Sequence, residues 1–199
     1  MAATTDNSEI YMINNEIHFN CDINAKTTMK LIEKLLTLQD KILKLSRDVY
    51  KKTEGDEHPF FTVKMHPILL FITTPGGNLH QTFSIVDTIE NMKVPVHTIC
   101  KGNVCSGGTL MSLSGKKRYM TKNSFMMIHE LRTFSGYAKF TEFMESVENL
   151  TMFMNTIKEY YVMKTGMTLE EVDEQLKKDV YWNAATCLEK GLIDDIWEP

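Results

Sequence analysis

Residues 101–109 read Lys-Gly-Asn-Val-Cys-Ser-Gly-Gly-Thr, and this glycine-rich stretch decides how the chain folds. It lies between an apolar run, 94–100, and a helix-compatible run, 110–113. Strand, tight turn, serine and helix, in that order, lift a hydroxyl out of a sheet and point the first N–H groups of the helix toward it. The full G-x-S-x-G elbow is incomplete because Val104 holds the upstream glycine position. A serine at such a junction is also a common helix N-cap, so a structural role for Ser106 stays open.

The segments on both sides repeat the alternation of strand and helix. Another continuous apolar run, 67–73, is typical of a strand buried on both faces. It is followed by a second glycine turn, 75–77, and a helical pattern. Such alternation predicts an α/β fold with right-handed crossovers. We expect strands over 9–20, 67–73, 94–100, 117–120, 124–129 and 192–197, and helices over about 31–49, 79–91, 107–115, 138–164, 168–178 and 183–190.

The pattern over 138–164 carries more apolar surface than one neighbouring helix requires. Its apolar residues recur every three or four positions, which makes a heptad seam. Met144, Phe153 and Tyr160 lie off that seam. A helix buried in its own domain and a helix at a subunit interface both remain open. The seam residues are Phe140, Phe143, Val147, Leu150, Met154, Ile157 and Tyr161.

Length and composition indicate one soluble domain over 1–199. The net charge is −4 and no basic tract occurs, which argues against nucleic acid as the main ligand. No apolar run is long enough to cross a bilayer, and the first residues do not resemble a signal peptide. The four cysteines lack C-x-x-C spacing, which favours a reducing compartment and a cytoplasmic location. No H-E-x-x-H motif or clustered ligand set suggests a metal.

The two glycine turns suggest where chemistry could take place. In an open α/β sheet they fall at the carboxyl ends of neighbouring strands, where sites form. Their glycines would allow backbone N–H groups to face a substrate, as an oxyanion hole requires. The alternative interpretation is two tight turns without a chemical role. A phosphate-binding loop is disfavoured because neither G-x-G-x-x-G nor G-x-x-x-x-G-K-[ST] is present.

A nucleophilic serine needs a base, and the base needs an orienting group. His129 ends a predicted strand and His80 opens a helix beside the first glycine turn, and the pattern alone favours neither. His18 and His97 fit buried, hydrogen-bonded positions in strands, and the other two histidines, His58 and His66, precede proline in or beside a charged loop. Asp179 lies between two helices, where exposure or capping would explain it equally well.

Five separated blocks of the chain resemble the Clp protease proteolytic subunit in order and spacing. Ser106 and His129 are 23 positions apart, and His129 and Asp179 are 50 apart, both close to the spacing of that family. The likeness runs from about residue 16 to 196. The blocks are Phe71-Ile72-Thr73-Thr74-Pro75-Gly76-Gly77, Gly102-Asn103-Val104-Cys105-Ser106-Gly107-Gly108, Met126-Met127-Ile128-His129, Asp179-Val180-Tyr181-Trp182-Asn183-Ala184-Ala185 and Glu189-Lys190-Gly191-Leu192-Ile193-Asp194.

The resemblance implies a ClpP/crotonase-like α/β fold with stacked sheets of βαβ units and a projecting helix–strand handle, here 124–165. It implies Ser106 as nucleophile, His129 as general base and Asp179 as orienting carboxylate. The oxyanion donors would be the N–H groups of Gly77 and Gly107. Members of the family form seven-membered rings, stacked in pairs through the handles around a chamber. They cut unfolded polypeptides delivered by a hexameric AAA+ unfoldase, which uses the ATP, so no cofactor is expected on this chain.

Several positions depart from the family pattern. Gly107 stands where methionine is usual, and Leu131 stands where proline is usual. The run Ser106-Gly107-Gly108 instead resembles the related signal-peptide peptidases, which use serine and lysine. Residues 1–15 are short for the usual axial loop and first helix, and 41–66 has the character of an insertion. These departures suggest a divergent or phage-encoded member.

The sequence therefore predicts an ATP-dependent, self-compartmentalising serine endopeptidase subunit. Two alternatives keep the same fold: a phage capsid-maturation protease, and a catalytically silent ring subunit that assembles with active ones. A crotonase-type acyl-CoA enzyme is a more distant alternative, because it would leave the Ser/His/Asp set unexplained.

Overall fold

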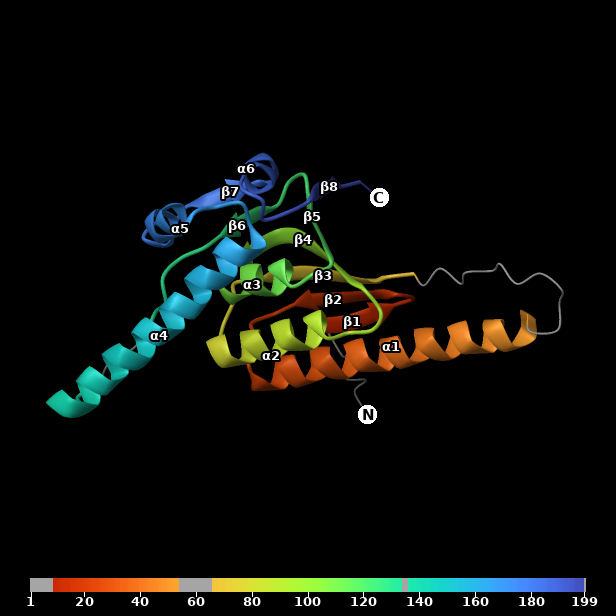
Figure 1. Ribbon diagram of the computed structural model, residues 1–199, viewed down its shortest axis with the longest axis horizontal. Coiled ribbons are helices and arrows are strands. Elements are labelled where there is room, and N and C mark those ends of the chain that lie inside the picture. The colour runs from red at the N-terminus through yellow and green to blue at the C-terminus, as the bar shows by residue number, and fades with distance from the viewer. Residues whose placement is uncertain (1–8, 54–65, 134–135, 199) are drawn as a thin grey trace, which may run out of the picture.

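The computed structural model describes residues 9–53, 66–133 and 136–198, and its strands join in one mixed eight-stranded sheet (Figure 1). The main path runs β1-β2-β3-β4-β5-β8, while β6 pairs with both β4 and β7. Only the β1–β2 and β6–β7 pairs are antiparallel. The strands are β1 (Ile10–Ile13), β2 (Glu16–Asn20), β3 (Ile68–Thr74), β4 (Val96–Cys105), β5 (Lys117–Thr121), β6 (Phe125–Met127), β7 (Tyr181–Asn183) and β8 (Asp195–Trp197).

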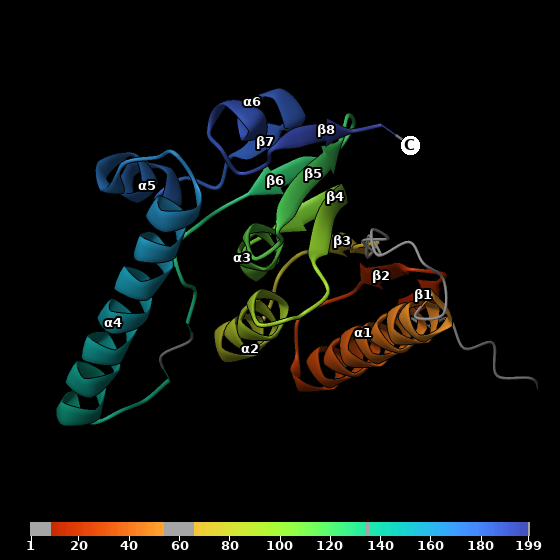
Figure 2. The ribbon, with the colours of Figure 1, turned by 45° about the vertical axis from the view of Figure 1, so that its right-hand side comes forward.

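Helices α1 (Ala25–Thr53), α2 (Leu79–Glu90) and α3 (Gly107–Leu113) cover one face of this sheet, and the long helix α4 (Phe140–Lys164) projects away from it (Figure 2). This arrangement confirms the α/β prediction, because parallel neighbours are connected through helices on the sheet face. The structure also contains helices α5 (Leu169–Leu176) and α6 (Ala184–Glu189).

Strand β4 is the branch point of the sheet. Its first half, His97 to Cys100, pairs with β5, and its second half, Asn103 to Cys105, pairs with β6. Gly102, between the two halves, has φ of 69°, a left-handed conformation that favours glycine. The sequence resemblance implied stacked sheets of βαβ units, and in the structure a single strand, β4, joins the two parts of the sheet. Strand β4 ends immediately before Ser106.

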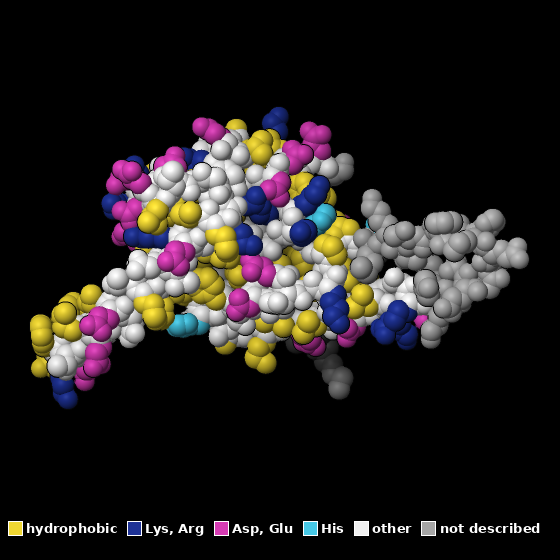
Figure 3. All heavy atoms as spheres, in the orientation of Figure 1, with side chains coloured by type: hydrophobic (Ala, Val, Ile, Leu, Met, Phe, Trp, Pro, Cys, Tyr) yellow, Lys and Arg dark blue, Asp and Glu magenta, His cyan; other side chains and the backbone are white. Residues whose placement is uncertain are grey.

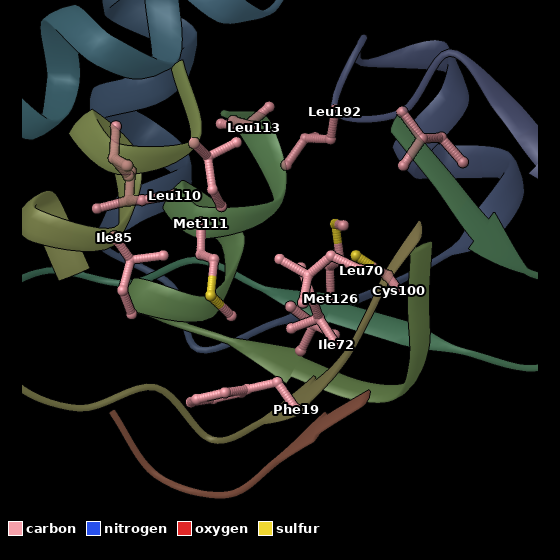
Figure 4. Packing of buried hydrophobic residues seen from close by; sticks show 14 of the residues in the cluster. Phe19, Leu70, Ile72, Ile85, Cys100, Leu110, Met111, Leu113, Met126 and Leu192 are labelled. Atoms are coloured by element: carbon pink, nitrogen blue, oxygen red, sulfur yellow. The ribbon is translucent and has the colours of Figure 1, made fainter. Parts of the chain in front are cut away.

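Much of the core lies between the sheet and helices α2 and α3 (Figure 4), and the same buried cluster includes residues of α1, α4, α5 and α6. Ile68, Leu70 and Ile72 occupy every second position along β3, so their side chains lie on one face of the strand. All three are fully buried. They pack with Ile85 of α2 and Met111 of α3 in one apolar cluster. Burying a side chain of this size contributes about 1.5–3 kcal/mol, so the cluster fixes which face of β3 the helices cover.

The opposite face of the sheet carries a row of ring side chains. His18 is stacked between Tyr11 and Phe71, with ring centroids 4.5 and 4.6 Å away. Trp197 meets Phe71 and Tyr119 edge-on at 5.9 and 5.3 Å. Ring packing of this kind adds to the stability of this face of the sheet.

The expected elements are largely present, with differences in length. The predicted strand 9–20 is a hairpin of β1 and β2, which turns at Asn14 with φ of 55°. The predicted strand 94–100 continues to Cys105 as β4, because Val104 pairs with Thr74 and Met126. Strand β7 was missing from the sequence prediction, which had only a loop before the helix at 183. Its three residues are too short to show a periodic pattern, and its pairing partner β6 lies far away in sequence.

Helix α1 keeps its apolar stripe against the sheet only part of the way. Leu31, Leu35 and Leu38 are buried, whereas Leu45 is exposed. The predicted insertion 41–66 includes the later part of this helix. Its residues 54–65, which contain His58, and the first eight of the short segment 1–15 lie outside the described residues.

Helix α4 is buried only at its C-terminal end. Ile157, Tyr160 and Tyr161 are buried, while Phe140 and Phe143 expose 78% and 47% of their surface. Apolar side chains gather on the projecting end of the helix (Figure 3). The heptad seam is therefore not buried within this chain over its first half. The expected handle region contains β6 and α4, and residues 128–133 and 136–139 between them form no helix or strand.

None of the described helices is long and apolar enough to span a membrane.

The capping box of α5 offers a test of the local structure. Thr168 Oγ1 accepts a bond from the N–H of Glu171, whose carboxylate accepts one from the N–H of Thr168. The bond from the Thr168 N–H, aided by the Thr168 side chain, holds the pKa of the Glu171 carboxyl below its usual range. We expect Thr168→Ala to cost about 1 kcal/mol, which lowers Tm by about 2–4 °C for a chain of this size. Thr168→Ser keeps the hydroxyl and should melt with the wild type in calorimetry; equal melting of both variants would contradict the capping role.

Candidate active site

Ser106 sits at a strained turn between β4 and α3. Its φ of 55° and ψ of −127° are uncommon for a residue with a side chain. The turn is held in place by its backbone, because the Ser106 N–H donates to the carbonyl of Met127 on β6 at 2.9 Å. Ser106 occupies the N-cap position of α3, yet its side chain makes no capping hydrogen bond. The sequence left open a role for Ser106 as a helix cap. In the structure the Ser106 hydroxyl does not perform that role.

The first glycine turn packs directly against this elbow. Gly76 has φ of 100°, and a Cβ built on it would lie 2.6 Å from the Cβ of Ser106. Gly77 has φ of 153°, and a Cβ there would lie 2.1 Å from the carbonyl oxygen of Ile23. Close approach and left-handed backbone both require glycine at these two positions. The turns at 75–77 and 106–108 thus meet at one end of the sheet, as their sequence positions predict.

Four of the five predicted site residues line one pocket of about 470 Å³: Ser106, His129, Gly77 and Gly107. Apolar wall comes in part from α4, through Leu150, Phe153, Ile157 and Tyr161, and polar side chains such as His80, Glu130 and Arg132 line the rest. A cleft that combines apolar walls with polar groups is the usual form of a binding site.

Among the described residues, two that line this pocket have backbone N–H groups without an internal partner. Across residues 9–53, 66–133 and 136–198, no hydrogen bond uses the N–H of Gly77 or Gly107. Gly107 begins α3, where the first N–H groups have no intrahelical acceptor. At the bridge between Gly77 and Ile23, the ladder instead uses the carbonyl of Gly76 and the N–H of Asn78. Both N–H groups can donate hydrogen bonds to a bound carbonyl oxygen, and these bonds would stabilise the negative charge that develops on it.

His129 is placed by neighbours on both sides of its segment. The N–H of Glu130 donates to the carbonyl of Leu176 on α5 at 2.9 Å, and Leu131 contacts Met154 of α4 through its N–H. His80 lines the same pocket, with its ring edge-on to Phe153 at 5.2 Å. Both candidate bases therefore line the pocket that contains Ser106. Among the described residues, no hydrogen bond joins either histidine to the serine.

Asp179 does not line the pocket. It forms an ion pair with Arg132, a pocket residue that the sequence analysis did not single out. The side chains of Arg132 and Asp179 are 68% and 56% exposed. The structure thus brings the predicted carboxylate to the rim of the site, where it is paired with a guanidinium and not with His129. No spacing rule in the sequence indicates Arg132, because the pairing depends on how the segments after β6 and α5 meet.

The thiol next to the nucleophile does not compete with it. Cys105 is buried, and its sulfhydryl donates to Oδ1 of Asn103 at 3.1 Å. Burial is the main cause that raises the pKa of this thiol. Cys105 is also absent from the pocket lining, whereas Ser106 is part of it, so Ser106 is the better candidate in this turn. No group of three or more His, Cys, Asp or Glu side chains in the described part of the chain could hold a metal ion.

The family is established by comparison. The family model for Clp protease matches residues 62–199. The ATP-dependent Clp protease proteolytic subunits of Streptococcus pneumoniae strains Hungary19A-6 and CGSP14 are both 33% identical over 132 residues, which cover 65% of this chain and 67% of theirs. The chain belongs to the Clp protease family, whose members are serine peptidases.

A solved structure agrees with the fold. An Asn-to-Asp mutant of ClpP1 from Listeria monocytogenes superposes with a TM-score of 0.75 at 19% identity, over 94% of this chain and 92% of that one. The match confirms the ClpP-like fold that the sequence resemblance implied.

The contact between Gly76 and Ser106 can be tested by adding a methyl group. We expect Gly76→Ala to destabilise the fold by about 1–3 kcal/mol, because it adds left-handed strain and forces the elbow to move. Gly166→Ala is the matched control, since a Cβ there meets nothing within 4 Å. Urea unfolding measures both. Equal stability of the two variants would show that Gly76 is not packed tightly against Ser106.

Proposed function

We propose that this chain is the proteolytic subunit of a Clp-type serine endopeptidase that hydrolyses peptide bonds of unfolded polypeptides. The observation that carries the proposal is the strained Ser106 in one pocket with His129 and two unused backbone donors. Family membership supports the reaction type. The apolar pocket walls suit a peptide side chain beside the scissile bond.

In this proposal Ser106 Oγ attacks the peptide carbonyl while His129 takes its proton. The tetrahedral oxygen gains negative charge and is stabilised by the N–H groups of Gly77 and Gly107. His129 then returns the proton to the leaving amine, and water repeats the cycle on the acyl-enzyme. Once the Asp179 carboxylate leaves Arg132, it would hold the imidazole of His129 in the required tautomer. No cofactor on this chain takes part.

We also propose the assembly typical of the family. Copies of the chain would form seven-membered rings, paired through α4, and a hexameric AAA+ unfoldase would supply substrate and use the ATP. The exposed apolar residues on the outer half of α4 support a contact of this kind, because large apolar patches on soluble proteins mark interaction sites. A cytoplasmic location would suit such a partnership.

A second candidate is a catalytically silent subunit of such a ring. The pairing of Asp179 with Arg132 favours it, because the carboxylate is then unavailable to His129. The ion pair is exposed, however, and exposed pairs contribute about 1 kcal/mol at most. A rearrangement on assembly or substrate binding could therefore release Asp179 at small cost.

A fluorophosphonate probe distinguishes the two candidates. We expect the probe to label Ser106 in the wild type. Ser106→Ala should abolish labelling and lower peptide hydrolysis by about 10⁴-fold or more. The mass of the assembly in solution should be the same for the variant and the wild type. Ser84→Ala, an exposed serine outside the pocket, is the control. Label that persists in Ser106→Ala would reject the nucleophile. An unlabelled wild type in the assembled state would favour the silent subunit.

Removal of the competing guanidinium tests the role of Asp179. We expect Arg132→Met to raise the labelling rate up to about fivefold, the factor that corresponds to 1 kcal/mol. Lys177→Met removes a nearby positive charge that pairs with Asp173 and Glu174 and should leave the rate unchanged. A slower or unchanged rate in Arg132→Met would contradict the competition between Arg132 and His129 for Asp179.

A further inference from the structure

A chain of buried hydroxyl groups lies behind the candidate nucleophile. Tyr161 of α4 places its Oη 2.5 Å from Oγ1 of Thr109 on α3. The same Oγ1 lies 2.6 Å from the carbonyl oxygen of Ser106, which also accepts the N–H of Thr109 at 2.9 Å. Tyr161 and Thr109 are 2% and 0% exposed, so water does not compete for these bonds.

The direction of the chain follows from its ends. A carbonyl oxygen can only accept, so the single hydroxyl proton of Thr109 goes to Ser106. Tyr161 must then donate its own proton to Thr109. Burial raises the pKa of Tyr161, which keeps the phenol protonated as this arrangement requires. The order of donation is Tyr161 to Thr109 to Ser106.

The last bond in this chain also orients a neighbouring N–H. The peptide unit between Ser106 and Gly107 is planar, so the Ser106 carbonyl and the Gly107 N–H lie in one plane and point in opposite directions. Holding the carbonyl therefore sets where the N–H points. Because Ser106 has a strained φ of 55°, its peptide needs such support to keep one orientation.

We infer that Tyr161 is a positioning residue, which acts through Thr109 to orient the Gly107 N–H and so connects the base of α4 to the oxyanion site. The inference rests on the proposed function, because that N–H matters for catalysis only if a carbonyl oxygen is bound there. Tyr161 also lines the pocket with its ring. Its hydroxyl and its ring can be separated by mutation, since Tyr161→Phe removes only the hydroxyl.

The chain contains a matched control in the next residue. Tyr160 also lies on α4, is buried, and donates its hydroxyl to Glu90 of α2 at 2.8 Å. Tyr160→Phe therefore removes one buried hydrogen bond from the same helix without touching the elbow. Thr109→Val breaks the chain at its middle, and Thr109→Ser restores it.

Two measurements on the full-length protein test the inference. In hydrogen exchange, Tyr161→Phe and Thr109→Val should speed exchange of the amides in 106–110 at least tenfold, whereas Tyr160→Phe and Thr109→Ser should not. In peptide hydrolysis and fluorophosphonate labelling, the first two variants should lose about 10- to 100-fold in kcat and labelling rate. KM should stay within twofold in Tyr161→Phe because the ring still lines the pocket.

Each outcome decides a separate point. Wild-type exchange in Tyr161→Phe would overturn the connection between α4 and the elbow. Equal losses in Tyr160→Phe and Tyr161→Phe would also overturn it, because they would report general loosening of α4. Faster exchange with unchanged kcat would overturn the positioning role. An unlabelled wild type would refute the proposed enzyme activity instead, and the exchange result would still decide whether Tyr161 holds the elbow.

Discussion

The conformation of Ser106 is the constraint on which the rest of this structure depends. The combination of φ at 55° and ψ at −127° is rare for a residue with a side chain, and it persists where the surrounding structure supports it. The N–H of Ser106 is bound by Met127 of β6, its carbonyl by Thr109 of α3, and its Cβ lies against Gly76. Three separate segments therefore converge on one residue. The branching of β4, which brings β6 alongside its second half, makes this convergence possible.

The same convergence places a pocket next to the two glycine turns. The parallel strands end together, so their glycine turns meet and expose two backbone donors. Helix α4 supplies apolar wall residues at its buried end and exposes apolar surface at its outer end. One helix thus borders the pocket and also presents a surface suited to another protein. Asp179 and Arg132 stand at the rim, where their exposure keeps the ion pair weak enough to exchange.

Much of this arrangement was predictable from the sequence because its signals are local. The continuous run 67–73, the stripe of α2 and the capping box at Thr168 depend on residues a few positions apart, and each forms the element expected. The five blocks that resemble the Clp protease family pointed to the ClpP-like fold that the comparisons then confirmed. Strand β7 escaped prediction because its three residues are defined only by their partner β6. The sequence pattern could not choose between His80 and His129, and both line the pocket that contains Ser106.

By itself the sequence determined the α/β class, the two glycine turns and the serine that follows β4, because periodicity and glycine placement act over short distances. Only the tertiary structure decided that the hydroxyl of Ser106 does not cap α3 and that Asp179 pairs with Arg132. It also decided that Tyr161 reaches Thr109 across 52 positions. Contacts between segments so far apart arise from the packing of whole elements, which no local pattern of residues encodes.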